Sequence, residues 1–496
     1  MGAGNTLLSG NLNNGAAGSD QDGRRPAHPH GRERQRLHAG PVTVAGGTLL
    51  LDNGNGSTTH YNSANFNING PSTLTFKSSA GAGSRNDLNA RTFTFDATGG
   101  GTVNTTGPIN WVVSNSTFVT NGGATDTLAT SINLNSGSIT FNTAVRGTGL
   151  VDLDVTAALG NSGAAVTKNG PGILRFAGSN SFAGALAINA GTLIIASSTA
   201  LGTSASATTV AAGAMLDLNG QSAGAEALTL NGTGILSAGA LINSSAVAAG
   251  LNGNVTMATA SSIGGSGDIT LGGVVSGPGL EKVGAGTLTL SNANTFTGAA
   301  TVSQGALLIN GTTPAAGLIN VSASATLGGG GSGGVATLAD GAVLSPGNAD
   351  GNTGNLFILA GLSMAADSVF RFEPGTPSNS YYTDPGSSYF TDHVTVNGAL
   401  TLNGRILVAY PAGSLVLRPE HRRRGRPLAG GELHRRPDRQ HPRDRPRLRP
   451  PGPGAGLPGQ HHLQPRLCVR RGGRARGGQR RAAGAGPRGL LRRRFR

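Results

Sequence analysis

The chain has 496 residues and a formal net charge of +15, yet only 12% of its residues are charged, against about 25% in an ordinary globular domain. Twenty-nine of its 38 Lys and Arg residues lie within residues 24–36 and 418–496, so the remaining body is mildly acidic and lacks the basic surface that binds nucleic acids. Its 83 glycines and 4% aromatic content are unusual for a mixed globular domain, and no apolar run of about 18 residues is present to form a transmembrane helix.

The N-terminal part changes character twice. Residues 1–19 are rich in Gly and Asn around short apolar segments, which predicts a β-rich fragment. Residues 20–39 are rich in Arg, His and Pro and interrupt this pattern, which resumes at residues 40–51. Met1–Asn5 has neither a basic start nor a following apolar run, so no signal peptide is visible.

A shifted reading frame explains the interruption. If the codons of His28–His38 are read one base later, they permit T-L-T-G-A-N-A-N-A-Y-T, which supplies the missing first half of a motif whose second half is residues 40–51. The same shift converts parts of residues 418–496 into ordinary β-rich sequence. We therefore expect a fragment of a longer protein with out-of-frame segments at 20–39 and 418–496, an expectation that resequencing of the locus tests.

Short alternating segments recur from residue 52 to residue 280. Ser72–Lys77, Arg91–Asp96 and Ser138–Phe141 are examples, and each is followed by Gly or Asn. Alternation with a period of two places the apolar side chains on one side of a β-strand. The spacing of these segments, roughly 15–25 residues, is that of one coil of a solenoid.

The most informative pattern occurs twice without a gap, at residues 168–195 and 282–309. Each copy alternates polar and apolar residues, turns at Gly and Asn, and resumes the apolar side, so one copy cannot bury its apolar side alone and stacked coils must cover each other. The shared positions are Lys168, Gly170, Gly172, Leu174, Asn180, Phe182, Gly184, Gly191 and Leu193 in the first copy, and Lys282, Gly284, Gly286, Leu288, Asn294, Phe296, Gly298, Gly305 and Leu307 in the second.

These residues follow the pattern K-x-G-x-G-x-L-x-L-x-x-x-N-x-F-x-G-x-x-x-V-x-x-G-x-L. The pattern resembles the autotransporter-associated β-strand repeat, also called the passenger-associated transport repeat, of large exported bacterial surface proteins. The resemblance implies a right-handed parallel β-helix and a surface-displayed passenger with a stalk or adhesin-like role, and it implies no reaction. Asn180 and Asn294 lie at matching turns and could stack as an asparagine ladder, and we expect Phe182 and Phe296 to pack inside the turns.

The C-terminal part divides into three stretches. Residues 374–391 are rich in Pro, Ser and Tyr and predict a loop, whereas residues 392–417 resume the alternation and predict terminal β coils. Residues 418–496 are rich in Arg, Pro and Gly, and we expect them to be disordered. The β-solenoid itself is expected to span residues 40–373.

Few residues suggest chemistry. Asp152 and Asp154 could share one strand face as a carboxylate pair, although no set of basic partners accompanies them. Gly328–Gly334 is expected to be a flexible turn and not a phosphate loop, because no helix-forming segment follows. Asp340, Asn348 and Asp350 lie near glycine-rich turns, but the spacing of calcium-binding β-helices is absent.

The basic tail offers two further hypotheses. His461, His462 and the single cysteine, Cys468, lack the second cysteine that a zinc site needs. The arginines would bind polyanions without sequence specificity and with strong salt dependence, and the tail has almost no aromatic residues to interleave with them.

The sequence therefore predicts an all-β parallel solenoid that is an exported, non-enzymatic surface protein with no cofactor and no metal. Its expected partner is a surface ligand, such as a glycan or a host or neighbouring-cell surface, and its expected location is the cell surface or outer membrane. Two alternatives remain open: a polysaccharide-degrading β-helix enzyme, and nucleic-acid binding through the basic tail.

Overall fold

The computed structural model describes residues 6–9, 41–52, 58–60, 65–77, 84–106, 109–135, 137–145, 150–160, 163–347, 354–373 and 392–408. All of them belong to one of two compact units, Met1–Arg423. The described residues are strands and turns, with one short 3-10 segment, η1 (Ile235–Ser237), and no α-helix. No described segment is a helix of sufficient length and apolarity to cross a membrane.

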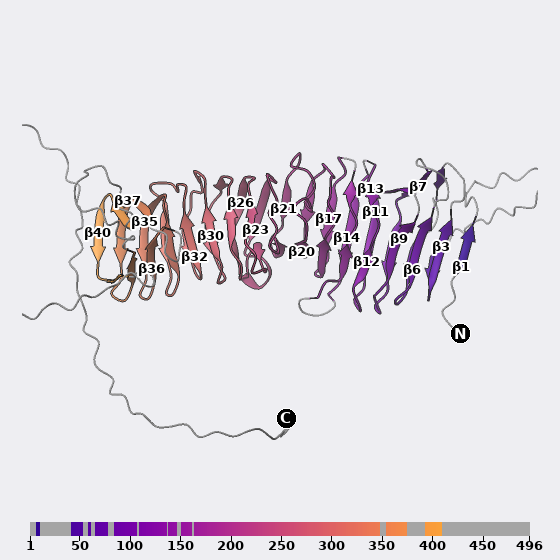
Figure 1. Cartoon of the computed structure of the whole chain (residues 1–496), viewed down its shortest axis with the longest axis horizontal. Helices are drawn as coiled ribbons and strands as arrows, with labels where there is room; N and C mark the ends of the chain where they lie inside the picture. Colours follow the sequence, from indigo (N-terminus) through magenta and orange to yellow (C-terminus); the bar gives the residue numbers. More distant parts are fainter. Residues whose placement is uncertain are drawn as a thin grey trace, which may run out of the picture. The chain divides into compact units, whose positions relative to one another are not determined.

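The strands stack in parallel as the coils of a β-solenoid, which confirms the predicted fold class (Figure 1). Each coil contributes to up to three faces, and most strands pair with the strand one coil before and the strand one coil after. The first face contains β2 (Val42–Val44), β5 (Phe66–Ile68), β8 (Thr92–Phe95), β11 (Ser116–Thr120), β14 (Ile139–Thr143), β17 (Val166–Asn169), β19 (Leu186–Ile188), β21 (Thr208–Val210), β23 (Leu228–Gly232), the start of β26 (Val255–Gly265), β28 (Val275–Ser276) and β39 (His393–Val396).

The second face continues in the same sheet as the first. It contains β1 (Thr6–Ser9), β3 (Thr48–Asp52), β6 (Thr73–Lys77), β9 (Thr102–Thr106), β12 (Asp126–Leu128), β15 (Leu153–Val155), β18 (Ile173–Phe176), β20 (Gly191–Ile195), β22 (Ala214–Asp217), β24 (Leu241–Asn243), the end of β26, β29 (Leu280–Lys282), β31 (Ala300–Val302), β33 (Leu318–Val321), β35 (Ser332–Leu338), β37 (Asn355–Met364) and β40 (Ala399–Leu402). Strands β26, β35 and β37 each run from the first face into the second.

The third face consists of two shorter sheets. The first sheet contains β4 (Thr58–His60), β7 (Ser84–Asn89), β10 (Ile109–Ser114), β13 (Ile132–Asn133) and β16 (Leu159–Gly160). The second contains β25 (Ala249–Leu251), β27 (Ile269–Leu271), β30 (Thr287–Leu290), β32 (Ala306–Ile309), β34 (Thr326–Gly329), β36 (Val343–Pro346), β38 (Val369–Phe372) and β41 (Arg405–Val408). Between them, Ser181 N donates to Leu159 O and Thr203 N donates to Phe182 O, so the stacking continues without regular strands.

The interior is filled by one inward side chain above another. In the N-terminal coils, Phe66 stacks on Phe93 at 5.2 Å between ring centroids, and Phe93 stacks on Phe118 at 4.6 Å. Phe93 and Phe118 are paired 25 residues apart, whereas Leu174 pairs with Leu193 only 19 residues later. The coils of the repeat are therefore shorter, and the paired inward positions Leu174 and Leu193 carry leucines where Phe93 and Phe118 carry aromatic rings.

One expected segment differs in the structure. Gly328–Gly334 is mostly strand and not a flexible turn, because it forms the end of β34, one corner and the start of β35. Residues 392–408 stack as terminal coils through β39, β40 and β41. The predicted loop at 374–391, the interruption at 20–39 and the tail at 418–496 lie outside the described residues, as do residues 409–417.

Candidate functional site

The most distinctive chemical feature is a buried lysine at a coil corner. Lys168 follows Val166 in β17, and the alternation that turns Val166 inward turns Lys168 inward as well. Its side chain has no exposed surface. Its Nζ donates hydrogen bonds to the carbonyl oxygens of Asn169 at 3.1 Å, of Gly170 at 2.7 Å and of Ala190 at 2.8 Å. One ammonium group thus joins the corner of its own coil to the corner of the next.

Lys282 repeats this arrangement at the end of β29. It is 2% exposed, and its Nζ donates to the carbonyl oxygens of Val283 at 2.8 Å, of Gly284 at 2.7 Å and of Gln304 at 3.2 Å. The third acceptor again lies 22 residues ahead, in the corner of the following coil. We call Lys168 and Lys282 the corner lysines.

Burial works against the charge on both corner lysines. It lowers the pKa of Lys168 to about 7, while the negative charge of Asp152 opposes that shift. It lowers the pKa of Lys282 to about 8, with Asp268 opposing. Three carbonyl acceptors require three N–H donors, and only the protonated amine has three. The three hydrogen bonds favour the ammonium form, whereas loss of hydration favours the neutral amine. The lowered pKa values show that the loss of hydration is the larger effect.

The repeat asparagines join coils in a related way. Asn180 Oδ1 accepts from the backbone N of Leu159 at 2.8 Å, and its Nδ2 donates to the oxygen of Ala200 at 2.6 Å. Asn294 accepts from Val275 N at 2.9 Å and donates to Thr312 O at 3.0 Å. The expected asparagine ladder is therefore wrong: each Asn contacts the backbone of the coils before and after it, and the two do not stack on each other.

The repeat glycines lie where neighbouring coils come closest. Gly191 has φ +68° and faces the carbonyl oxygens of Gly172 and Gly170, and Gly305 has φ +66° and faces those of Gly286 and Gly284. A Cβ on any of these residues would meet backbone atoms. The same holds at Gly184 and Gly298, the latter having Pro278 O only 1.6 Å from its Cβ position.

The apolar repeat residues lie inside the coils. Leu174, Leu193, Leu288 and Leu307 have no exposed surface, and Phe182 and Phe296 are each 1% exposed. Phe182 packs against the coil corner at Gly202, whose Cβ position lies 2.8 Å from the ring.

The two copies occupy different faces of the solenoid. Lys168 pairs with Phe141 and Ile188 on the first face, whereas Lys282 pairs with Ile263 and Val302 on the second face. The second copy is therefore rotated by one face, yet its corner contacts are the same. The motif therefore encodes a strand–corner–strand unit that can begin on the first face or on the second face of the coil.

Comparison with known families identifies this unit. The family model of the passenger-associated transport repeat matches residues 166–195 and 280–309.

The chain carries two passenger-associated transport repeats. Both matches begin two residues before a corner lysine and end in the strand that stacks on the second strand of the copy. A search of curated proteins found no significant match, and a search of solved structures found none either. The repeats and the β-solenoid around them fit a scaffold of the kind found in autotransporter passengers.

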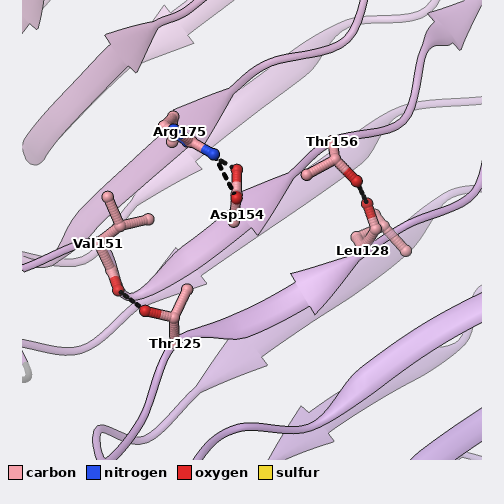
Figure 2. Close-up of polar contacts among 6 residues, drawn as sticks. All are labelled: Thr125, Leu128, Val151, Asp154, Thr156 and Arg175. Carbon is pink, nitrogen blue, oxygen red and sulfur yellow. Dashed lines mark hydrogen bonds and ion pairs between the residues drawn. The ribbon is translucent and has the colours of Figure 1, made fainter.

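The carboxylate pair proposed from sequence is not formed beside the first passenger-associated transport repeat. Asp154 points outward from β15 and makes a bidentate ion pair with Arg175 of β18, at 2.9 and 2.6 Å (Figure 2). Asp152 lies before that strand, is 2% exposed, and accepts from Ile173 N at 2.5 Å. The interpretation failed because the alternation does not extend across the corner, so the two side chains have separate structural partners.

Two threonine hydroxyls near this ion pair also form hydrogen bonds between adjacent coils. Thr125 Oγ1 donates to Val151 O at 3.0 Å, and Thr156 Oγ1 donates to Leu128 O at 3.4 Å, so both hydroxyls join adjacent coils (Figure 2). These contacts join adjacent coils and are therefore structural.

The remaining candidates give no site among the described residues. Asp340 is exposed and accepts from Asp367 N at 3.1 Å. Within the ranges that the structure describes, no group of three His, Cys, Asp or Glu side chains is placed to hold a metal ion. Asn348, Asp350, His461, His462 and Cys468 lie outside those ranges.

One buried acid was missed by the sequence analysis. Glu226 is 4% exposed, and Thr208 Oγ1 donates to its Oε1 at 2.7 Å. Burial raises the pKa of Glu226 from 4.5 to about 7, against the hydrogen bonds from Thr208. The available signal was its position two residues before Leu228, which the alternation places on the inward side.

We expect Glu226 to make the solenoid less stable as pH rises through neutrality. Between pH 4.5 and pH 7 the folded chain binds more protons here than the unfolded chain, so the stabilisation present at low pH is lost, by about 3 kcal/mol in total. Urea unfolding at pH 4.5 and pH 8 should show this loss in the wild type and a much smaller one in Glu226→Gln. Asp340→Asn is the control, and equal pH dependence in the wild type and Glu226→Gln would contradict the expectation.

Proposed function

We propose that the chain is a non-enzymatic, exported bacterial surface protein, a passenger-like scaffold with an adhesin-type role. The observation that carries this proposal is that the polar side chains of both repeats join coils: the corner lysines and the repeat asparagines bind backbone atoms one coil away. Side chains used in this way extend a stack of coils and are not available for a reaction.

The composition of the surface supports the same role. Low charge in the body and outward rows of Thr and Asn suit a solvated β surface that persists over many coils. On the first face, Thr92, Thr117, Thr140 and Thr167 are in register on successive coils. A surface partner, such as a glycan or the surface of a host or neighbouring cell, would meet this exterior, and the location we propose is the cell surface or outer membrane.

Surface display tests the export part of the proposal. The full chain is placed between a heterologous signal peptide and an autotransporter translocator in a Gram-negative host. We expect external protease to shave the solenoid from intact cells, with a periplasmic marker protein as the control for envelope integrity. Retention in the periplasm of cells that display an unrelated passenger would count against it.

A polysaccharide panel tests the non-enzymatic part. The purified chain is incubated with neutral and acidic polysaccharides, and new reducing ends and unsaturated uronate products are measured. We expect no product above buffer. Product formation by the wild type that disappears in Asp154→Asn would establish the enzyme alternative in place of the scaffold.

A further inference from the structure

A depression lies at the corner between the first and second faces, outside both hydrogen-bonded repeat corners. It has a volume of about 330 Å³ and spans three successive coils at β26, β29 and β31. Its lining includes Ser262, Pro278, Glu281, Ala299 and Thr301, and Thr233 of the preceding coil. Its volume is therefore near the lower limit of about 300 Å³ for ligand pockets.

The depression occurs where the regular coil is interrupted. The pairing of β23 with β26 shifts between Leu230 and Gly232, and the chain then makes an excursion closed by a bridge between Gly234 and Gly239. Two successive residues in that excursion, Leu236 and Ser237, have left-handed φ values of 51° and 59°. Thr233, which precedes the excursion, lines the depression.

Glu281 presents a positioned negative charge there. In β29 it points outward because Lys282 points inward. Ser262 Oγ donates to its Oε2 at 2.8 Å, and Ser303 Oγ donates to its Oε1 at 2.7 Å. Each carboxylate oxygen thus accepts one hydrogen bond and keeps a further lone pair. Among the described residues, no Lys or Arg forms an ion pair with this carboxylate.

The hydrogen-bond directions select the kind of ligand. Ser262 and Ser303 already direct their protons at the carboxylate, which fixes it without neutralising it. A primary ammonium can donate to the remaining lone pairs in a charge-assisted hydrogen bond. The hydroxyls of Thr233 and Thr301 suit sugar hydroxyls, and Pro278 and Ala299 offer apolar contact to the C–H face of a ring.

We propose that this depression binds an amino sugar through Glu281, with the ammonium on the carboxylate and the ring hydroxyls on the threonines. A lysine side chain of a partner protein supplies the same ammonium, but its apolar stem would leave those hydroxyls unused. Anionic glycans are repelled by the unpaired carboxylate. The proposal goes beyond the scaffold role and does not rest on it.

Binding to the purified full chain tests this assignment. The probes are β-1,4-linked glucosamine disaccharide, its N-acetylated counterpart and lysine amide, each followed by calorimetric titration. We expect the glucosamine disaccharide to bind at least about tenfold more tightly than the other two. Binding of lysine amide with equal affinity would overturn the sugar assignment, and absence of binding by all three probes would overturn the site.

Variants separate the site from the fold. Glu281→Gln should lower the affinity for the glucosamine disaccharide at least about tenfold. Asp340→Asn, which changes an exposed carboxylate elsewhere, should leave this affinity unchanged. Ala299→Phe should fill the depression and block binding while Glu281 is intact. Unchanged affinity in either Glu281→Gln or Ala299→Phe would contradict the proposal. Because binding is measured on the purified chain in solution, absence of binding would not contradict the proposal of surface display.

Discussion

Replacing Gly298 with alanine should separate two coils of the solenoid. The added Cβ would lie 1.6 Å from the carbonyl oxygen of Pro278 and 2.7 Å from its carbonyl carbon. Both obstacles are backbone atoms, so no side chain can rotate away and the coils must move apart. Overpacking costs about 1–3 kcal/mol, and we expect a value at the upper end of this range because the backbone itself must move. Hydrogen–deuterium exchange should show increased exchange in the neighbouring strands β28 and β31 first, because each coil contacts only its neighbours.

Two other glycines provide matched controls. Gly213 has φ +77° with no atom within 4 Å of its Cβ position, so Gly213→Ala tests backbone strain alone, at about 1 kcal/mol. Gly330 has neither a left-handed φ nor a neighbour within 4 Å, and Gly330→Ala should be neutral or slightly stabilising. If Gly298→Ala exchanged no faster than Gly330→Ala, the close approach of these coils would not exist in solution.

Replacing Lys282 with methionine should destabilise the second repeat by about 3 kcal/mol. Methionine keeps the apolar stem and removes the ammonium, so the carbonyl oxygens of Val283, Gly284 and Gln304 lose their donor. Each buried carbonyl left without a partner costs about 1–3 kcal/mol, and the relief of a buried charge offsets part of the total. Denaturant unfolding and local hydrogen exchange measure the loss. Lys168→Met should behave alike, whereas Lys77→Met, at a half-buried outer position, should change stability much less.

The pH dependence of this variant has a defined sign. The pKa of Lys282 is about 8 in the folded chain and about 10.4 in the unfolded chain. Between these values the unfolded chain binds more protons, so the stability contributed by Lys282 is full above the unfolded pKa and is lost as pH falls through 8. The stability gap between the wild type and Lys282→Met should therefore widen from pH 8 to pH 10. If this stability difference narrowed as the pH rose, the folded corner would favour the ammonium form of Lys282 more strongly than the unfolded chain does, which would contradict the lowered pKa.

The fold class was predictable because its signals are local. Alternation in segments such as Arg91–Asp96 gives inward and outward sides, and the coil-length spacing of such segments implies stacking. The two copies align without a gap because their coils have the same length. Leu174 pairs with Leu193, and Leu288 pairs with Leu307, each 19 residues later. Coils of equal length cannot gain or lose a residue without moving every inward side chain to the outside.

The candidate site was predictable only in part. The corner lysines were recognisable as repeat positions, but nothing local shows that three carbonyl oxygens converge on each Nζ. Asp152 and Asp154 were assigned to one face because a period of two was extended across a corner. Glu281 has no sequence signal of its own, since its partners Ser262 and Ser303 lie 19 and 22 residues away.

By itself, the sequence determined that this protein is a stack of β coils with leucines inside and glycines at the corners, because each of those features depends on residues close together in the chain. Only the tertiary structure decided which face each repeat occupies. Lys168 begins a copy on the first face and Lys282 on the second, and the strand–corner–strand unit is the same in both. The rotation depends on the coils between the copies, including the excursion at Gly234–Gly239, and the hydrogen bonds that define each corner are made to residues one full coil away.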